Sequence, residues 1–244
     1  MNSKKFKYVY GPVPSRRLGR SLGVNPIPLK TCNYSCVYCQ LGRTLHLINE
    51  RQEFFPKEDI LDEIIEAVSL NRNKIDFITF VGEGEPTLNI NLGWLIEMAK
   101  SKTGLPVAVI TNGALLYDEG VREDLSKADV VLPSLDTVFE ETFKRLNRPH
   151  KSITIDKVVD GQIRFREIYK GQIWLEIMLV KGLNDSQKEL TGLANALKKI
   201  RPDRVYINVP IRPPAEPWAV PPDEEAIVRA HAILGNVVPI THPE

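Results

Sequence analysis

The sequence predicts an α/β protein that folds in a single domain as an open, partial (β/α)6 barrel, similar to an incomplete TIM barrel. Six apolar runs of strand length alternate along the chain with segments of helical periodicity. Six such units are too few to close an eight-stranded barrel. The 244 residues and 43% hydrophobic content suit one core of this size. A doubly wound sheet of the flavodoxin type has the same alternation and remains the structural alternative.

The expected elements can be placed in order. Strands are expected at residues 22–27, 75–81, 105–110, 129–135, 172–180 and 204–209. Helices are expected at residues 57–70, 92–100, 117–126, 138–146, 153–169, 186–199 and 223–234. In the first helix Ile60, Ile64 and Val68 share one face, and Ser186 with Glu189 forms a capping box that begins the sixth.

Composition and charge exclude several classes of protein. Lys and Arg number 32 against 31 Asp and Glu, a formal net charge of +1, which excludes an electrostatically driven, sequence-blind nucleic-acid coat. No apolar run approaches the ~20 residues that span a bilayer, and the N-terminus lacks the apolar stretch of a secretory signal. We therefore expect a cytoplasmic protein with no membrane partner.

A proline-rich strap, residues 210–222, precedes the last helix. Six of its thirteen residues are proline, which makes it stiff and extended. We expect residues 1–222 to form the barrel core with its N-terminal segment, and residues 223–244 a C-terminal helix packed on that core. The strap is either a linker locked for stability or a cover over the open barrel, with Arg212 and Trp218 facing substrate.

The three cysteines, Cys32, Cys36 and Cys39, all lie within eight residues of a polar loop. Such a cluster favours a metal centre over a disulfide framework. Thiolates suit iron–sulfur clusters and zinc alike, and His46 could complete a Cys3His zinc site. Three unligated structural cysteines are the remaining alternative.

The C-x3-C-x2-C spacing, with Tyr38 just before the third cysteine, resembles the signature of the radical S-adenosylmethionine (SAM) superfamily. The resemblance implies that Cys32, Cys36 and Cys39 hold three irons of one [4Fe-4S] cluster, whose fourth iron binds SAM. It also implies the open barrel, and reductive cleavage of SAM to a 5′-deoxyadenosyl radical that abstracts hydrogen from a substrate. A reductant such as flavodoxin or ferredoxin would supply the electron.

Polar motifs follow the next two expected strands, at the end where ligands bind in parallel α/β folds. Gly82-Glu83-Gly84-Glu85 resembles the Gly-Gly-Glu element that holds the SAM amino group in the superfamily, except for Glu83 in place of a glycine. Thr111-Asn112-Gly113 resembles part of the family's SAM-facing rim, although it is also a common Asn-Gly turn.

Three further side chains are candidates for the SAM ribose. Ser134 and Asp136 follow the fourth strand, where Asp136 could instead cap the next helix. Glu176 lies in an apolar strand and needs a partner, either a ribose hydroxyl or an arginine.

Basic residues flank the cysteine loop in the sequence and could attract phosphate or balance the charge of the cluster. They are Arg16, Arg17, Arg20, Lys30 and Arg43.

The segment Leu179-Val180-Lys181-Gly182 resembles the wyosine-synthase branch, enzymes that modify tRNA, which makes Lys181 a candidate substrate contact. No cysteine remains for a second cluster of the kind those enzymes carry. We therefore expect a minimal radical SAM enzyme acting on an RNA nucleoside or a nucleotide-like molecule. The alternatives are a radical SAM enzyme acting on a protein or small metabolite, such as a minimal glycyl-radical activase, and a zinc-stabilised binding module.

Overall fold

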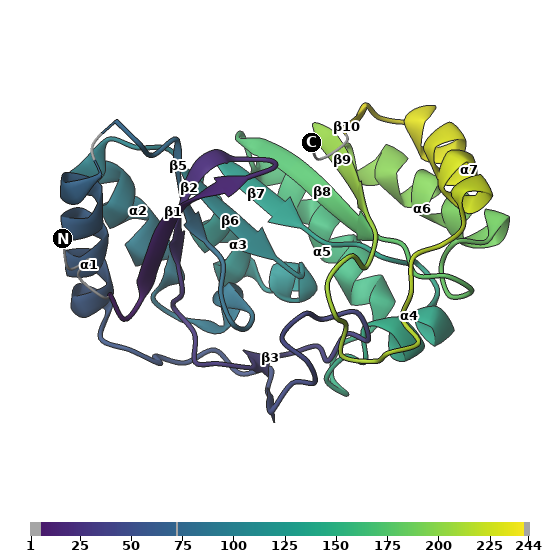
Figure 1. Cartoon of the computed structure of the whole chain (residues 1–244), viewed down its shortest axis with the longest axis horizontal. Coiled ribbons are helices and arrows are strands. Elements are labelled where there is room, and N and C mark those ends of the chain that lie inside the picture. Colours follow the sequence, from purple (N-terminus) through teal and green to yellow (C-terminus); the bar gives the residue numbers. More distant parts are fainter. Residues whose placement is uncertain (1–5, 72, 242–244) are drawn as a thin grey trace.

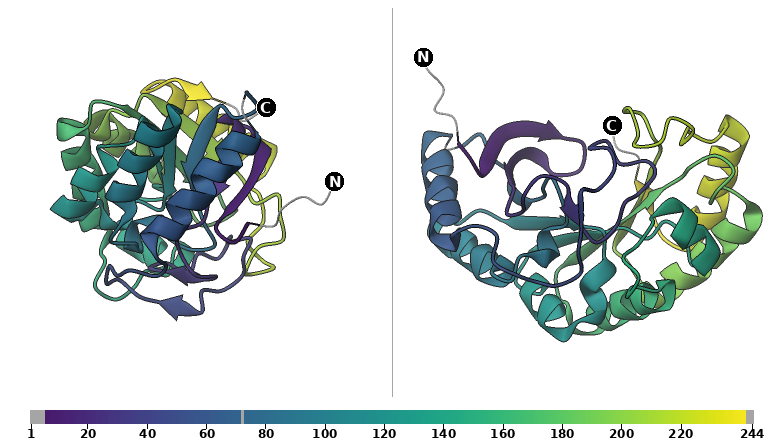
Figure 2. Two further views of the ribbon diagram at one scale, coloured as in Figure 1. Left: turned by 90° about the vertical axis from the view of Figure 1, so that its left-hand side faces the viewer. Right: turned by 90° about the horizontal axis from the view of Figure 1, so that it is seen from below.

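The computed structural model, which describes residues 6–71 and 73–241, is built around one twisted sheet. Its eight strands run in the order β1-β2-β5-β6-β7-β8-β9-β10. The helices line the convex outer side of this sheet (Figures 1 and 2). The strand bounds are β1 Val9–Ser15, β2 Gly19–Val24, β5 Phe77–Phe80, β6 Val107–Thr111, β7 Val130–Pro133, β8 Gln172–Met178, β9 Arg204–Asn208 and β10 Ile240–Thr241.

The six predicted strands are confirmed as β2 and β5 to β9, all paired in parallel. They follow one another in the sheet as they do in the chain, without the reversal of order that defines a doubly wound sheet. The sheet is not closed. The open, partial barrel is therefore confirmed, and the flavodoxin-like alternative is wrong.

Both edges of the sheet carry strands that the sequence did not reveal. Strand β1 pairs antiparallel with β2 and shifts register between Tyr10 and Val13. Its two prolines hide the strand pattern, yet an edge strand tolerates them because its outer N–H groups need no ladder partner. Strand β10 is only two residues long, which gives no periodicity to detect.

The predicted helices are present with shifts of a few residues at their ends. Their bounds are α1 Lys57–Leu70, α2 Leu92–Thr103, α3 Glu119–Leu125, α4 Glu140–Leu146, α5 Ile155–Ile168, α6 Gln187–Ile200 and α7 Glu224–Gly235, with 3-10 turns η1 Pro86–Leu88 and η2 Ala114–Tyr117. Ser186 caps α6 through the N–H of Glu189, as the capping box predicts. No helix in the described part of the chain is both long and apolar enough to span a bilayer.

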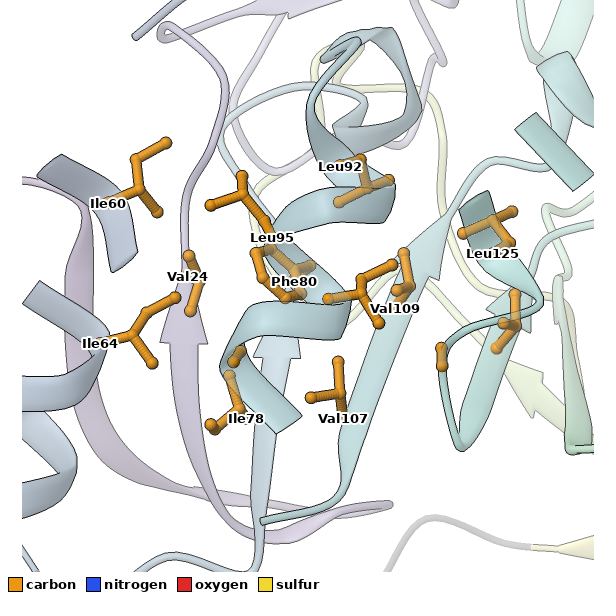
Figure 3. Close-up of a cluster of buried hydrophobic side chains, with 14 of the residues drawn as sticks. Val24, Ile60, Ile64, Ile78, Phe80, Leu92, Leu95, Val107, Val109 and Leu125 are labelled. Atoms are coloured by element: carbon orange, nitrogen blue, oxygen red, sulfur yellow. The ribbon is translucent and has the colours of Figure 1, made fainter. Parts of the chain in front are cut away.

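Alternate strand residues face two different environments. Those facing outward pack on the helices; Val24, Phe80 and Val109, for example, meet Ile60, Ile64 and Leu95 (Figure 3). Their neighbours facing inward form a separate small cluster inside the barrel, made of Leu18, Ala108, Val130, Leu132, Trp174 and Tyr206. Leu18 comes from the β1–β2 turn, which therefore reaches into the barrel.

Helix α7 shares the second large core with α6 and the sheet. Ala230 and Leu234 are buried there against the apolar face of α6. Residues 242–244 of the expected C-terminal segment lie outside the described residues, as do residues 1–5 of the expected core. The division at residue 222 stays a prediction.

Candidate active site

The loop that carries the cysteines lies between β2 and α1, beside the loop that follows β5. It contains a two-residue strand, β3 Thr31–Cys32, paired with β4 His46–Leu47. The backbone N–H of Glu85 donates to the Thr31 carbonyl at 3.0 Å, and the N–H of Lys30 donates to the Glu83 carbonyl at 2.6 Å. A Cβ on Gly84 would stand only 1.8 Å from the Thr31 oxygen, so this contact requires glycine.

A second loop, between α4 and α5, supports the cysteine loop from the other side. The N–H groups of Ser35 and Val37 donate to the carbonyls of Asn147 and Leu146 at 3.0 and 2.9 Å. Arg148, next in the chain, adopts the left-handed region with φ of 47°. Sequence reasoning missed this loop, because nothing in the end of a helix marks it as the partner of a distant loop.

The three thiols are partly exposed, and two of them receive polar donors. The Asn112 amide Nδ2 lies 3.6 Å from Cys32 Sγ, and the Asn147 Nδ2 lies 3.6 Å from Cys36 Sγ. Burial raises the pKa of the Cys32 thiol to about 12, with the Glu85 charge adding to the shift. Burial and the Asp136 charge also raise the pKa of Cys36 well above its usual value.

This donor set fits an iron–sulfur cluster. One loop carries three soft thiols, and N–H groups point at two of the sulfurs. The raised pKa values of Cys32 and Cys36 favour their protonated thiols, so a bound metal would have to displace those two protons. Within residues 6–71 and 73–241, no three His, Cys, Asp or Glu side chains gather closely enough to hold a single metal ion.

The Glu85 carboxylate is buried and accepts four hydrogen bonds. Three come from the Thr87 N–H, the Thr87 hydroxyl and the Thr111 hydroxyl, at 3.1, 2.6 and 2.6 Å. The Asn112 N–H supplies the fourth, at 2.8 Å. Burial raises the pKa of Glu85 against the opposing effect of these donors. Its side chain thus ties the loop after β5 to the end of β6, while Glu83 remains exposed beside Asn25.

Asp136 holds a second buried network. Its carboxylate accepts from the Tyr38 hydroxyl at 2.5 Å, the Asn147 amide at 2.7 Å and the Met178 N–H at 2.8 Å. The capping alternative for Asp136 is wrong, because α4 has Phe139 at its N-cap position. Burial raises the pKa of this carboxyl. Four predicted residues line one pocket behind the cysteine loop: Tyr38, Asn112, Ser134 and Asp136.

Glu176 projects from β8 inside the barrel and pairs with Arg17 from the β1–β2 turn. Their side chains are only 13% and 22% exposed, so the pair lies largely out of solvent. The arginine partner considered as an alternative for Glu176 is therefore present. Burial lowers the pKa of Arg17.

The proline-rich strap lies along the cysteine loop (Figure 1). Glu216 binds Arg43 of the cysteine loop and Arg148 of the loop between α4 and α5, and its own N–H donates to the Val37 carbonyl at 2.9 Å. Arg212 reaches Gln40, whereas Trp218 stays half exposed. Sequence reasoning missed Glu216, although its position as the one acidic residue among residues 210–222 was a usable signal.

Several expected contacts do not gather at the site. The Lys181 ammonium lies 3.9 Å from Asp223 and is more than half exposed. Arg20 is bound to Asp76 at the start of β5, the far end from the cysteine loop. With Arg17 and Arg43 also paired to carboxylates, the basic residues flanking the loop do not form one free cationic rim.

An open parallel barrel with three thiols held beside its strand ends defines a class of enzymes. The sequence model of the Radical SAM superfamily matches residues 27–194, more than half of the chain. The chain belongs to the radical SAM superfamily and is a radical SAM enzyme, which sets aside the zinc-stabilised binding module.

Within that superfamily the chain falls among the UPF0026 proteins. It is 44% identical to the UPF0026 protein MJ1312 of Methanocaldococcus jannaschii over 230 residues, covering 94% of this chain and 71% of that protein. It is also 28% identical to the GTP 3′,8-cyclase of Limosilactobacillus fermentum, over 64% of this chain and 45% of that protein.

Two solved structures share the fold at low sequence identity. A radical SAM methyltransferase from Sphaerobacter thermophilus is 18% identical with a TM-score of 0.67, covering 91% of this chain and 66% of that one. TYW1 with a lysine–pyruvate adduct bound is 16% identical with a TM-score of 0.66, covering 90% of this chain and 74% of that one. Such likeness shows the fold alone, so the wyosine-synthase resemblance stays a prediction.

Proposed function

We propose that Cys32, Cys36 and Cys39 hold one [4Fe-4S] cluster and that this chain cleaves SAM reductively. The observation that carries the proposal is the packing of the glycine-rich loop after β5 on the cysteine loop, with Gly84 against the Thr31 carbonyl. When bound, the cluster and SAM supply a 5′-deoxyadenosyl radical that abstracts hydrogen from substrate.

The chain's own residues bind and orient SAM and shield the radical. We assign SAM binding to the surface that comprises Tyr38, Gly82, Glu83, Gly84, Glu85, Thr111, Asn112, Ser134, Asp136 and Glu176. Within this set the Glu85 and Asp136 carboxylates are saturated with donors, so their part is to position the loops that carry the others. Glu216 keeps the strap on the cysteine loop, where it limits access of water and of stray C–H bonds to the radical.

For the substrate we propose a nucleotide-like molecule or an RNA nucleoside. Support comes from the similarity to a GTP 3′,8-cyclase and from the Arg17–Glu176 pair inside the barrel, in which the Arg17 Nε donor has no hydrogen-bond partner among the described residues. We further propose a cytoplasmic setting, because three unpaired thiols suit a reducing compartment, and flavodoxin or ferredoxin as electron donor.

Anaerobic reconstitution with iron and sulfide, followed by SAM and a strong reductant, tests the assignment. About four irons per chain and release of 5′-deoxyadenosine that is lost in Cys36→Ala would support it. About one zinc per chain with intact SAM would contradict it. Deuterium transfer from labelled nucleotides or RNA into 5′-deoxyadenosine tests the substrate, and transfer only from a peptide or small metabolite would favour the alternatives.

A further inference from the structure

Two asparagines on different elements present an amide N–H to a cysteine sulfur, and neighbouring groups fix the orientation of each. In Asn112, which follows β6, the side-chain oxygen accepts from the Ala114 N–H at 2.9 Å. Its Nδ2 must then face the other way, where it donates to the Asn33 oxygen at 2.6 Å and stands 3.6 Å from Cys32 Sγ. The larger radius of sulfur makes this a hydrogen-bond distance.

Asn147, at the C-terminal end of α4, is oriented by a carboxylate. Its Nδ2 lies 2.7 Å from Asp136 Oδ2, which accepts and cannot donate while it is ionised. The amide must therefore point its NH2 group at this network, and the same nitrogen lies 3.6 Å from Cys36 Sγ. Asn147 is buried, with only 3% of its surface exposed, so water does not compete for the bond.

These hydrogen bonds would act on the cluster itself, because the sulfurs that accept them are proposed cluster ligands. Electron density on a coordinating thiolate increases when its cluster is reduced, so an N–H directed at the sulfur stabilises the reduced state more than the oxidised state. For Cys39, no side-chain donor to the sulfur is described within residues 6–71 and 73–241. The side-chain donors therefore act on two of the three proposed ligands, Cys32 and Cys36.

We infer that Asn112 and Asn147 are positioning residues that raise the reduction potential of the cluster through Cys32 and Cys36. The inference rests on the proposed function, since it requires a cluster on these thiols. Removing either donor should make reduction harder by about tenfold in the equilibrium constant, which is ~59 mV for a one-electron couple.

The test is a redox titration of the reconstituted whole chain without SAM, with the reduced cluster followed by electron paramagnetic resonance. Asn112→Leu and Asn147→Leu keep a side chain of similar size and lose the donor. The matched control is Asn89→Leu, which replaces another fully buried asparagine that donates to the Pro26 carbonyl and not to sulfur. We expect lower potentials for the first two variants, at full iron content, and an unchanged potential for the control.

Equal potentials in the parent and in both variants would overturn the inference while leaving the proposed function intact. A parent chain that binds no cluster would overturn the proposed function and the inference with it. Should a leucine variant take up less iron than the parent, Asn112→Ser and Asn147→Ser, which shorten the side chain without adding an apolar group, are titrated in its place. A lowered potential in the serine variants supports the inference, and an unchanged one overturns it.

Discussion

Glu85→Gln separates a positioning role of this carboxylate from direct contact with SAM. The two carboxylate oxygens share four donors, and each oxygen receives one backbone N–H, from Thr87 or from Asn112. Whichever way the glutamine amide turns, its NH2 faces one of these N–H groups, which then loses its acceptor. A buried donor without a partner costs about 1–3 kcal/mol. For a chain of this length that corresponds to a melting temperature lower by about 2–12 °C.

The assay is calorimetry of the cluster-free chain, which removes any contribution of ligands to stability. Glu83→Gln serves as the control, because it lies two residues away in the same loop and is exposed. A melting temperature of Glu85→Gln within about 1 °C of the parent would show that the network is not structural. If that variant then also bound SAM more weakly, the Glu85 carboxylate would be a ligand contact rather than a support.

Three further outcomes are expected. Cys36→Ser should lose the visible absorbance and most of the iron of the reconstituted chain, and retention of about four irons would contradict the ligand assignment. Arg17→Met should lower the free energy of unfolding by up to ~3 kcal/mol, because it leaves the Glu176 charge without a partner, and the double variant Arg17→Met/Glu176→Met should lower it less. Denaturant-induced unfolding measures both values, and stability losses of the single variants that add up in the double variant would contradict the pairing. Glu216→Gln should speed amide hydrogen exchange in the strap, residues 210–222, relative to the parent, because the strap then loses its ion pairs to Arg43 and Arg148. Arginines hold the pKa of Glu216 below its ordinary value. The parent's strap should therefore keep its protection from exchange, corrected for the intrinsic rate, from neutral pH down through the usual glutamate range near ~4.3 and lose it only at lower pH. Loss of that protection already at pH 6 would contradict the pairing.

Most of the barrel could be predicted from the sequence because its strands are continuous apolar runs and its helices carry one apolar face. The strands that escaped prediction have no such pattern. Strand β1 contains Pro12 and Pro14, and β10 is two residues long. These edge strands form because β2 and β9 offer unpaired backbone groups, a cause that acts through space rather than along the chain.

For the candidate site, the sequence predicted which residues lie near one another but not what each side chain bonds to. Motif positions placed Tyr38, Asn112, Ser134 and Asp136 in one region, and the structure brings them to one pocket. What each side chain bonds could not be read from the motifs. Asn147 joined the site through the loop after α4, and no local feature of the sequence marks that contact.

The backbone contact between Gly84 and the Thr31 carbonyl sets how the site can change. At this contact no side chain separates the two loops, so the distance between the cysteine loop and the loop after β5 cannot be changed by exchanging one side chain for another. A larger residue at position 84 would act as a wedge and separate the loops, and no smaller residue exists. In this chain the width of the opening therefore depends on the lengths of the loops and on the strap, and not on a side chain at position 84.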